Sequence, residues 1–321
     1  MKTNFNILLA IVLILSLTAS CEKDVVNIKH PEFNFKLVIS GYLSPDEKNH
    51  YISVATNEPI YYDRILDYNQ GLFSATLSDG SKEISLRPLF HKFYRYSFND
   101  STSVISDVPN SSFNIPGVPD SSIIGFIFTS SELSVEGGNT YVLKVESDKG
   151  LFAEASCTVP YKKNLFPELD TVSIHYTNSY DNSKYTYLQP DFYFTDIKGE
   201  DNYYGIFSEL TWPNPPYTYS KTQNKILVDP KYNCFNDKGI DGNRLKIPLE
   251  SFYNTNLHDS TYFKIYLLNT DKPYYDYHKS IEKYQSGETP FTEASPVYSN
   301  IKGGLGIFAA YTYDSIVVRL K

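Results

Sequence analysis

The sequence predicts an all-β protein. From residue 35 onward it consists of short runs of β-branched and aromatic residues separated by turn residues, a spacing typical of sandwiches and barrels. The aromatic residues are mostly tyrosine, with 29 Tyr and 20 Phe against one Trp, which suits strands that expose one face to water. The length of the chain favours two domains. We therefore expect two β-sandwich (immunoglobulin-like) domains, the second with a long loop insertion and one short helix.

The first β-sandwich is expected at residues 35–160. Its first run, "FKLVISGYL", places alternate residues on two faces. Hairpins are predicted at Gly80 and Gly150, because glycine allows the positive φ that tight turns require. Pro160 closes the domain, since proline has no N–H to donate within a central sheet.

The second sandwich-like domain is expected at residues 161–321. It holds an irregular insertion at 213–243, and a loop of that length inside a compact domain is usually functional or disordered. One helix is predicted at 272–285, where Asp271 can cap the first N–H groups. An apolar stripe recurs along it at steps of three and four, at Tyr274, Tyr277, Ile281 and Tyr284.

The first twenty residues have the layout of a secretory signal. Lys2 precedes an uninterrupted apolar run, Ile7–Leu15, which is shorter than the roughly 20 residues of a membrane-spanning helix. Small residues then lead to Cys21, as in the lipobox of bacterial lipoproteins, where the thiol receives a diacylglyceryl group. We expect removal of residues 1–20, lipidation of Cys21 and a tether at 21–34; an ordinary signal with a coincidental cysteine is the alternative.

The charge balance narrows the classes of partner. Without residues 1–20, which hold one lysine and no acidic residue, the chain keeps 28 of its 29 basic residues against 37 acidic ones, a net charge of −9. Such a balance disfavours nucleic acid as a partner, and the lipid is the one membrane contact we expect. Cys157 and Cys234 remain for a disulfide, which an exported protein allows and the sequence does not decide.

Residues for a catalytic or metal site do not cluster in the sequence. It has no histidine pair around a glutamate at zincin spacing, no G-x-S-x-G elbow and no P-loop. The segment "DKGIDG" begins like a calcium loop, but Pro248 stands where an EF-hand needs glutamate; we prefer a turn, with irregular calcium binding as the alternative. His278 is expected on the helix surface. We expect no enzyme activity, no cofactor and no metal, and a surface hydrolase is the least favoured function.

Aromatic residues in and beside the insertion are the candidate ligand-binding residues. Trp212, Tyr217 and Tyr219 lie among prolines that stiffen the backbone, and such rings offer apolar faces with polar edges. Packing of these rings onto the sandwich is the alternative interpretation. The glycines of "KGGLG" predict either a tight turn or a close approach of a partner to the backbone.

Several segments resemble the domain-of-unknown-function family 4249, lipoproteins of the Gram-negative outer membrane. They are "CEKDVVNI", "KLVISGYLS", "YVLKVESDKGLFAEASCTVP" with the "LDTVSI" that follows, "FNDKGIDGN" and "ASPVYSNIKGGLGIFAAY". The resemblance implies an accessory lipoprotein that partners a TonB-dependent transporter, and it brings no catalytic residues. We expect a non-enzymatic protein, lipid-anchored in the outer membrane on its periplasmic or cell-surface face, that docks on such a transporter or captures its cargo. A free-standing glycan- or peptide-binding lipoprotein is the alternative.

Overall fold

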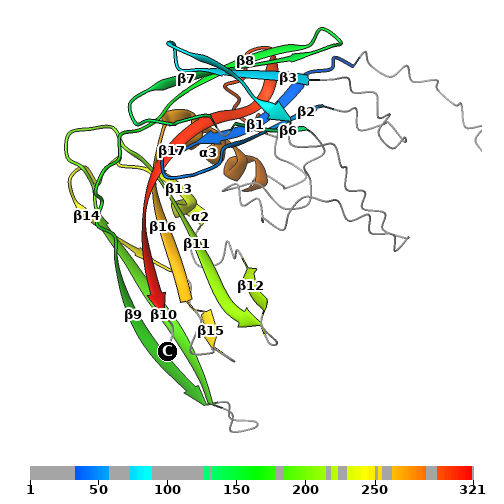
Figure 1. The fold of residues 1–321 in the computed structure, drawn as a ribbon. Coiled ribbons are helices and arrows are strands. Elements are labelled where there is room, and N and C mark those ends of the chain that lie inside the picture. Colours follow the sequence, from blue (N-terminus) through cyan, green and yellow to red (C-terminus); the bar gives the residue numbers. More distant parts are fainter. Residues whose placement is uncertain are drawn as a thin grey trace, which may run out of the picture. The chain divides into compact units, whose positions relative to one another are not determined.

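A computed structural model of the chain describes residues 33–57, 73–88, 126–130, 132–177, 184–214, 218–222, 230–249, 252–254, 262–286 and 295–319. Residues Phe35–Lys321 form one compact unit, separate from Met1–Asn34, and the described elements are predominantly β, as the sequence predicts (Figure 1). The predicted signal peptide, Cys21 and most of the predicted tether lie outside the described residues. No helix within the described ranges has the length and apolar character needed to cross a bilayer.

The largest sheet has nine strands among the described residues. Eight follow one another in the order β12 (Thr218–Thr222), β11 (Tyr203–Asn214), β16 (Tyr262–Thr270), β17 (Gly304–Arg319), β1 (Leu37–Leu43), β2 (Tyr51–Thr56), β6 (Phe126–Thr129) and β5 (Arg87–Pro88), and β13 (Cys234–Asn236) pairs with β11.

Two four-stranded sheets and two helices complete the described elements. One sheet has the order β4 (Glu83–Ser85), β3 (Phe73–Ser78), β7 (Thr140–Ser147) and β8 (Phe152–Thr158). The other has the order β14 (Arg244–Pro248), β10 (Lys184–Thr195) and β15 (Phe252–Asn254), with β9 (Glu168–Thr177) also paired to β10. The helices are the single turn α2 (Pro230–Asn233) and the longer α3 (Lys272–Ser286).

Strand β17 connects the two ends of the chain within one sheet. Its first part runs parallel to β1, with Leu37 opposite Gly304, and its second part runs antiparallel to β16, with Tyr311 opposite Thr270. Strands from both sides of residue 160 therefore share this sheet. The predicted domain bounds stay predictions, and the three sheets do not confirm two immunoglobulin-like sandwiches.

The first hydrophobic core lies between β1, β2 and β17 on one side and β3, β7 and β8 on the other. Alternation in β1 and β8 places every second side chain in it, as the pattern predicts; its buried members include Leu37, Ile39, Leu43, Val54, Leu77, Leu143, Ala153, Ala155 and Phe308. Both predicted hairpins are confirmed, β3–β4 and β7–β8, with positive φ at Gly80 (88°) and Gly150 (80°). Strand β8 ends before Pro160, as predicted.

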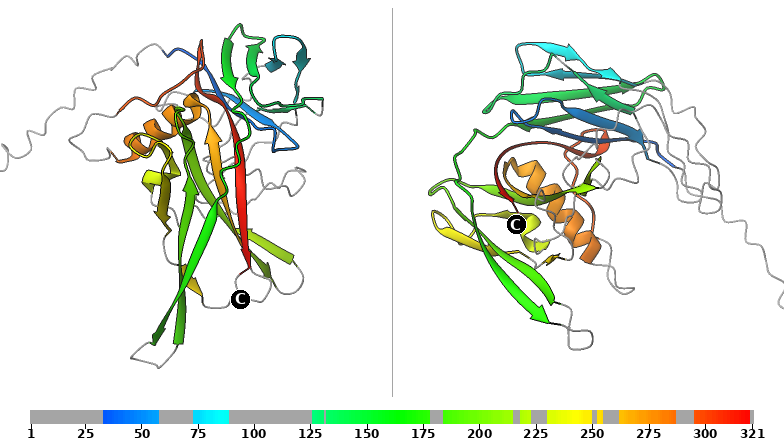
Figure 2. Two further views of the ribbon diagram at one scale, coloured as in Figure 1. Left: turned by 90° about the vertical axis from the view of Figure 1, so that its left-hand side faces the viewer. Right: turned by 60° about the horizontal axis from the view of Figure 1, so that its bottom comes forward.

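Helix α3 covers the opposite face of β1 and β17 (Figure 2). Its bounds match the predicted helix, and the carboxylate of Asp271 accepts the N–H of Tyr274 at 3.0 Å, which confirms the predicted cap. The cluster beneath the helix is rich in tyrosine, with Tyr42, Tyr266, Tyr274 and Tyr311 buried beside Ile307, Ala309 and Cys234. The middle of the large sheet is therefore buried on both faces.

The segment predicted as an irregular insertion contains regular structure. Residues 213–243 include the end of β11, all of β12, α2 and β13. Pro213 lies in β11 opposite Tyr219 of β12. The prolines of this segment therefore did not prevent β11 from pairing with β12. Proline is tolerated there because the pairing of β11 with β16 ends at Thr211, so Pro213 lies in a part of β11 that is paired on one side alone.

Candidate functional site

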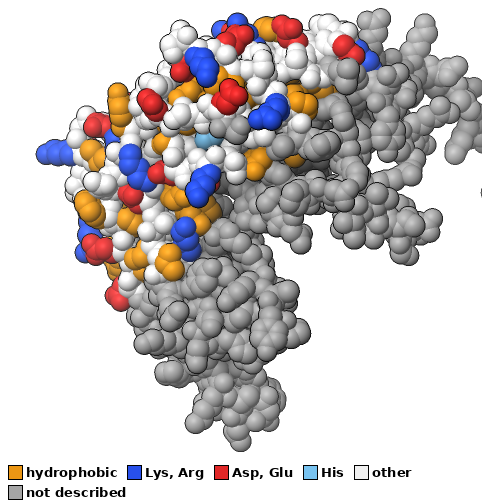
Figure 3. Space-filling model, viewed as in Figure 1, with side chains coloured by type: hydrophobic (Ala, Val, Ile, Leu, Met, Phe, Trp, Pro, Cys, Tyr) orange, Lys and Arg blue, Asp and Glu red, His pale blue; other side chains and the backbone are white. Residues whose placement is uncertain are grey.

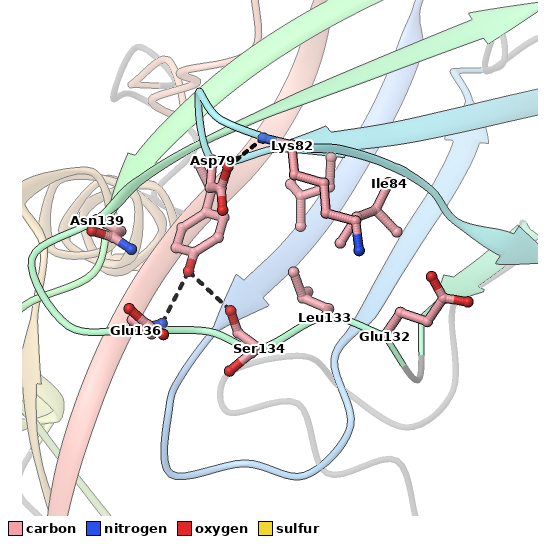
Figure 4. Close-up of a pocket in the computed structure, with 10 residues that line it drawn as sticks. Asp79, Lys82, Ile84, Glu132, Leu133, Ser134, Glu136 and Asn139 are labelled. Carbon is pink, nitrogen blue, oxygen red and sulfur yellow. Dashed lines mark hydrogen bonds between the residues drawn. The ribbon is translucent and has the colours of Figure 1, made fainter.

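A pocket opens between the β3–β4 hairpin and the segment 132–139 that leads into β7 (Figure 4). Its volume is about 230 Å³, enough for a small ligand group or a single side chain. The residues that line it are Leu77, Asp79, Lys82, Ile84, Glu132, Leu133, Ser134, Glu136, Asn139 and Tyr141. The local sequence explains both walls, since a glycine turn closes the hairpin and the Gly137–Gly138 turn reverses the chain before β7.

Tyr141 fixes one wall of the pocket. Its side chain is 1% exposed, its hydroxyl donates to the carbonyl of Ser134 at 3.2 Å, and the same hydroxyl accepts the N–H of Glu136 at 2.9 Å. These two bonds, dashed in Figure 4, hold the segment 134–136 against the start of β7. The buried hydroxyl has both a donor and an acceptor partner, so its burial carries no unpaired polar atom.

Asp79 fixes the opposite wall. One of its carboxylate oxygens accepts three hydrogen bonds at 2.8 Å, from the N–H and the hydroxyl of Ser81 and from the N–H of Lys82. Those donors, first of all the Lys82 N–H, lower the pKa of this exposed carboxyl. Asp79 is therefore a charged turn residue, and hydrogen bonds within its own hairpin fix the position of its side chain.

The lining of the pocket combines apolar and charged side chains. Leu77, Leu133 and the ring of Tyr141 supply apolar surface, while Glu132 and Glu136 bring negative charge to the segment opposite Lys82. Six of the ten described lining residues are polar or charged, so the pocket is more polar than most small-molecule sites, whose walls are mainly apolar. The described lining residues include neither histidine nor cysteine.

The sequence-predicted binding residues lie elsewhere. Trp212 is in β11 opposite Ser220, and Tyr219 is in β12 opposite Pro213, so the backbone brings these two positions onto paired strands. Tyr217 and the lipidation residue Cys21 lie outside the described residues.

The candidate calcium loop and the two cysteines of the candidate disulfide are the remaining sites considered in the sequence. Asp237 accepts the N–H of Asn202 at 2.8 Å and Asp241 accepts that of Gly199 at 2.7 Å, so "DKGIDG" is a turn, the preferred interpretation. Within the described ranges, no group of three or more His, Cys, Asp or Glu side chains is placed to hold a metal ion. Cys157 and Cys234 are free and buried, so they form no disulfide in this structure.

His278 differs from its expected surface position. It is half-buried in α3, its ring centre is 4.3 Å from that of Tyr274, and its Nε2 atom is 3.3 Å from the hydroxyl of Tyr42. The helical stripe of Tyr274 and Tyr277 did not include position 278. The reason for the difference is that Tyr42 of β1 also contacts the helix at position 278, beside that stripe.

The pocket itself was not predicted, although its parts were. The "SDGS" turn and the strand that begins at Thr140 are both evident in the sequence, but their approach depends on the pairing of β3 with β7, where Ser78 lies opposite Val142. A tyrosine placed just after a glycine turn, as Tyr141 is, was the one local signal available.

The comparisons with known proteins identify the family of the chain. No curated protein matches the chain significantly. The model of the family described as a domain of unknown function, DUF4249, matches residues 23–316, and the chain therefore belongs to this family.

Proposed function

We propose that this protein is a lipid-anchored, non-enzymatic accessory protein of the outer membrane, which docks on a TonB-dependent transporter or captures its cargo. The position of Cys21 carries the proposal. It follows an apolar run and three small residues, and it stands two residues before the family region begins at residue 23. Acylation there attaches the whole family region to a bilayer through its first residues, and a multiply acylated cysteine is a stable anchor.

The pocket supports the capture of a ligand. Its walls are set in advance by the Tyr141 and Asp79 hydrogen bonds, so little ordering is needed when a ligand enters.

We also infer that the β3–β4–β7–β8 sheet and the β1–β2–β6 strands form an immunoglobulin-like sandwich. The support is their shared core and the Tyr141 hydroxyl, whose bond to backbone upstream resembles the tyrosine corner of such folds.

Acylation is tested by feeding cells an alkyne-tagged fatty acid and measuring the label on the purified protein. We expect label on the wild type and on Cys157→Ser, and none on Cys21→Ser. Cys157→Ser is the matched control because it also removes one thiol. An unlabelled wild type that is released into the medium would overturn the anchor.

Docking is tested by purifying an affinity-tagged full chain from detergent-solubilised outer membranes. We expect a β-barrel transporter to copurify with it in near-equal amount and to survive a high-salt wash. Repeated recovery of the protein alone would remove docking from the proposal and leave ligand capture.

A free-standing glycan- or peptide-binding lipoprotein is the second candidate. The observation that favours it is that Trp212 and Tyr219 lie on the paired strands β11 and β12, which brings both positions to the same end of the large sheet. Binding to glycan and peptide arrays, compared between Trp212→Ala, Tyr217→Ala and the pocket variant Glu136→Gln, separates the two sites. An affinity that neither aromatic substitution changes excludes a binding site on β11 and β12.

A further inference from the structure

Three exposed apolar side chains lie at the edge of the unit where the described chain begins. They are Phe35, Phe152 and Leu305, with exposed fractions of 55%, 47% and 39%; we call them the tether-end patch. On the face drawn in Figure 3, basic and acidic side chains are interspersed with small apolar areas. Exposed large apolar residues that gather at one edge of a domain can form a contact with an apolar partner.

Backbone contacts bring the three residues of the tether-end patch to one edge. Leu37, two residues after Phe35, lies opposite Gly304, and Leu305 follows directly in the same parallel pair. A Cβ atom at Gly303 would lie 2.5 Å from the carbonyl oxygen of Phe152. The starts of β1, β8 and β17 therefore meet at this edge.

Charged residues of both signs lie beside the tether-end patch. Lys36 precedes β1, Lys302 lies before β17 and exchanges backbone hydrogen bonds with Glu154, and both lysines are exposed. Glu146 lies across the β7–β8 pair from Phe152. Aromatic rings flanked by lysines are typical of the membrane interface, because the rings enter the headgroup region while lysine stems extend their ammonium groups to the phosphates.

The length of chain before the tether-end patch limits its distance from Cys21. Residues 22–34 separate the two, and thirteen residues reach at most about 45 Å when fully extended. A lipid on Cys21 therefore keeps Phe35 within that distance of the bilayer. Such a tether turns a weak surface contact into an intramolecular one with a high effective concentration.

We propose that the tether-end patch rests on the lipid bilayer, with Phe35 and Phe152 in the headgroup region; the proposal rests on the lipid anchor at Cys21. It also orients the pocket. Strand β7 is antiparallel to β8, with Thr140 opposite Thr158, so the pocket residues beside Thr140 lie at the end of the sheet away from Phe152. Contact at the patch turns the pocket away from the membrane, towards diffusing ligands.

The test compares a reporter at the patch with one at the other end of the same strand. Phe152→Trp and Tyr161→Trp each place a tryptophan at an exposed aromatic position, and Tyr161 (70% exposed) follows the far end of β8, about 20 Å away. Each full-length acylated protein is reconstituted into phosphatidylcholine vesicles with and without brominated lipid. The unsubstituted protein supplies the background from Trp212.

We expect bromolipid to reduce the emission of the tryptophan at position 152 by about twofold and to leave that at 161 unchanged, since bromine quenches only at the depth of the acyl chains and headgroups. Equal quenching at both positions, or none at either, would overturn the proposal. The same two tryptophan variants, each also carrying Cys21→Ser, are titrated with vesicles. This titration separates the lipid anchor at Cys21 from the membrane contact of the tether-end patch. Quenching at position 152 that grows with lipid supports the patch even if Cys21 is not acylated, whereas acylated protein without quenching at 152 keeps the anchor and removes the patch.

Discussion

Asp271 and Ala310 exchange two hydrogen bonds between the start of α3 and the centre of β17. The backbone N–H of Asp271 donates to the Ala310 carbonyl at 3.0 Å, and the Asp271 carboxylate accepts the Ala310 N–H at 3.1 Å. The other carboxylate oxygen caps the helix at Tyr274. One buried side chain therefore fixes the helix both to its own first turn and to the sheet that it covers.

Asp271 should make the stability of the protein depend on pH. Burial raises its pKa from 3.8 to about 7, and the N–H groups of Tyr274 and Ala310 offset only part of that rise. The folded state then keeps a proton that the unfolded state releases, so this group's stabilising contribution is complete below pH 3.8 and is lost as the pH rises to about 7. Relative to the non-titrating variant Asp271→Asn, the wild type should lose about 2 kcal/mol between pH 5 and 7.

Urea unfolding at several pH values measures this difference. Asp79→Asn is the control, because the pKa of Asp79 is lowered and its carboxyl is ionised in both states throughout that window. A difference between wild type and Asp271→Asn that stays constant from pH 5 to 7 would contradict the prediction.

Gly306 should be the least replaceable glycine of the "GGLG" segment. Its φ is 106°, and a Cβ atom there would lie 2.0 Å from the carbonyl oxygen of Ile39 in the paired strand β1. Gly306→Ala should therefore reduce the free energy of unfolding by about 3 kcal/mol or more, because the backbone of β1 must shift. Gly80→Ala is the matched control, with a φ of 88° and open space around the new methyl group, and should cost only about 1 kcal/mol. Equal losses in denaturant unfolding would show that φ alone matters.

The elements that the sequence predicts correctly depend on local interactions. The hairpins at Gly80 and Gly150 and the helix capped by Asp271 each need only neighbouring residues, so their patterns are complete within a short window. In the "GGLG" segment the tight turn is confirmed, and the close approach of a partner stays untested. Gly303 makes a turn, and Gly304 and Gly306 let the backbone of β1 come close.

What could not be predicted depends on contacts between distant parts of the chain. The parallel pairing of Leu37 with Gly304 joins strands from opposite ends of the sequence, and no periodicity within either strand specifies its partner. Tyr141 was expected only as a strand residue, because its hydrogen bonds to Ser134 and Glu136 appear once the preceding segment has turned back. The pocket depends both on local contacts, which form its two turns, and on contacts between distant residues, which bring those turns together.

Tyr141→Phe should loosen one wall of the pocket while keeping its apolar surface. The substitution removes the hydroxyl that joins Ser134 and Glu136, and loss of two hydrogen bonds by buried groups should cost about 1–2 kcal/mol. Amide hydrogen exchange at Glu136 should accelerate, because its N–H loses its acceptor. Tyr161→Phe changes an exposed ring and should alter neither quantity. Unchanged exchange at Glu136 would contradict the role assigned to the hydroxyl.

The thiols of Cys157 and Cys234 should be unreactive in the folded protein and both available after unfolding. Each is buried, and burial raises the pKa of both, that of Cys234 to about 12. Since the thiolate is the reacting form, a maleimide at pH 8 should label the native protein about a thousandfold more slowly than the unfolded one. Mass spectrometry after unfolding without reductant should find two labels although the chain has three cysteines, because acylation of Cys21 removes the third thiol. Three labels would contradict the anchor, and none would show that Cys157 and Cys234 are joined by a disulfide.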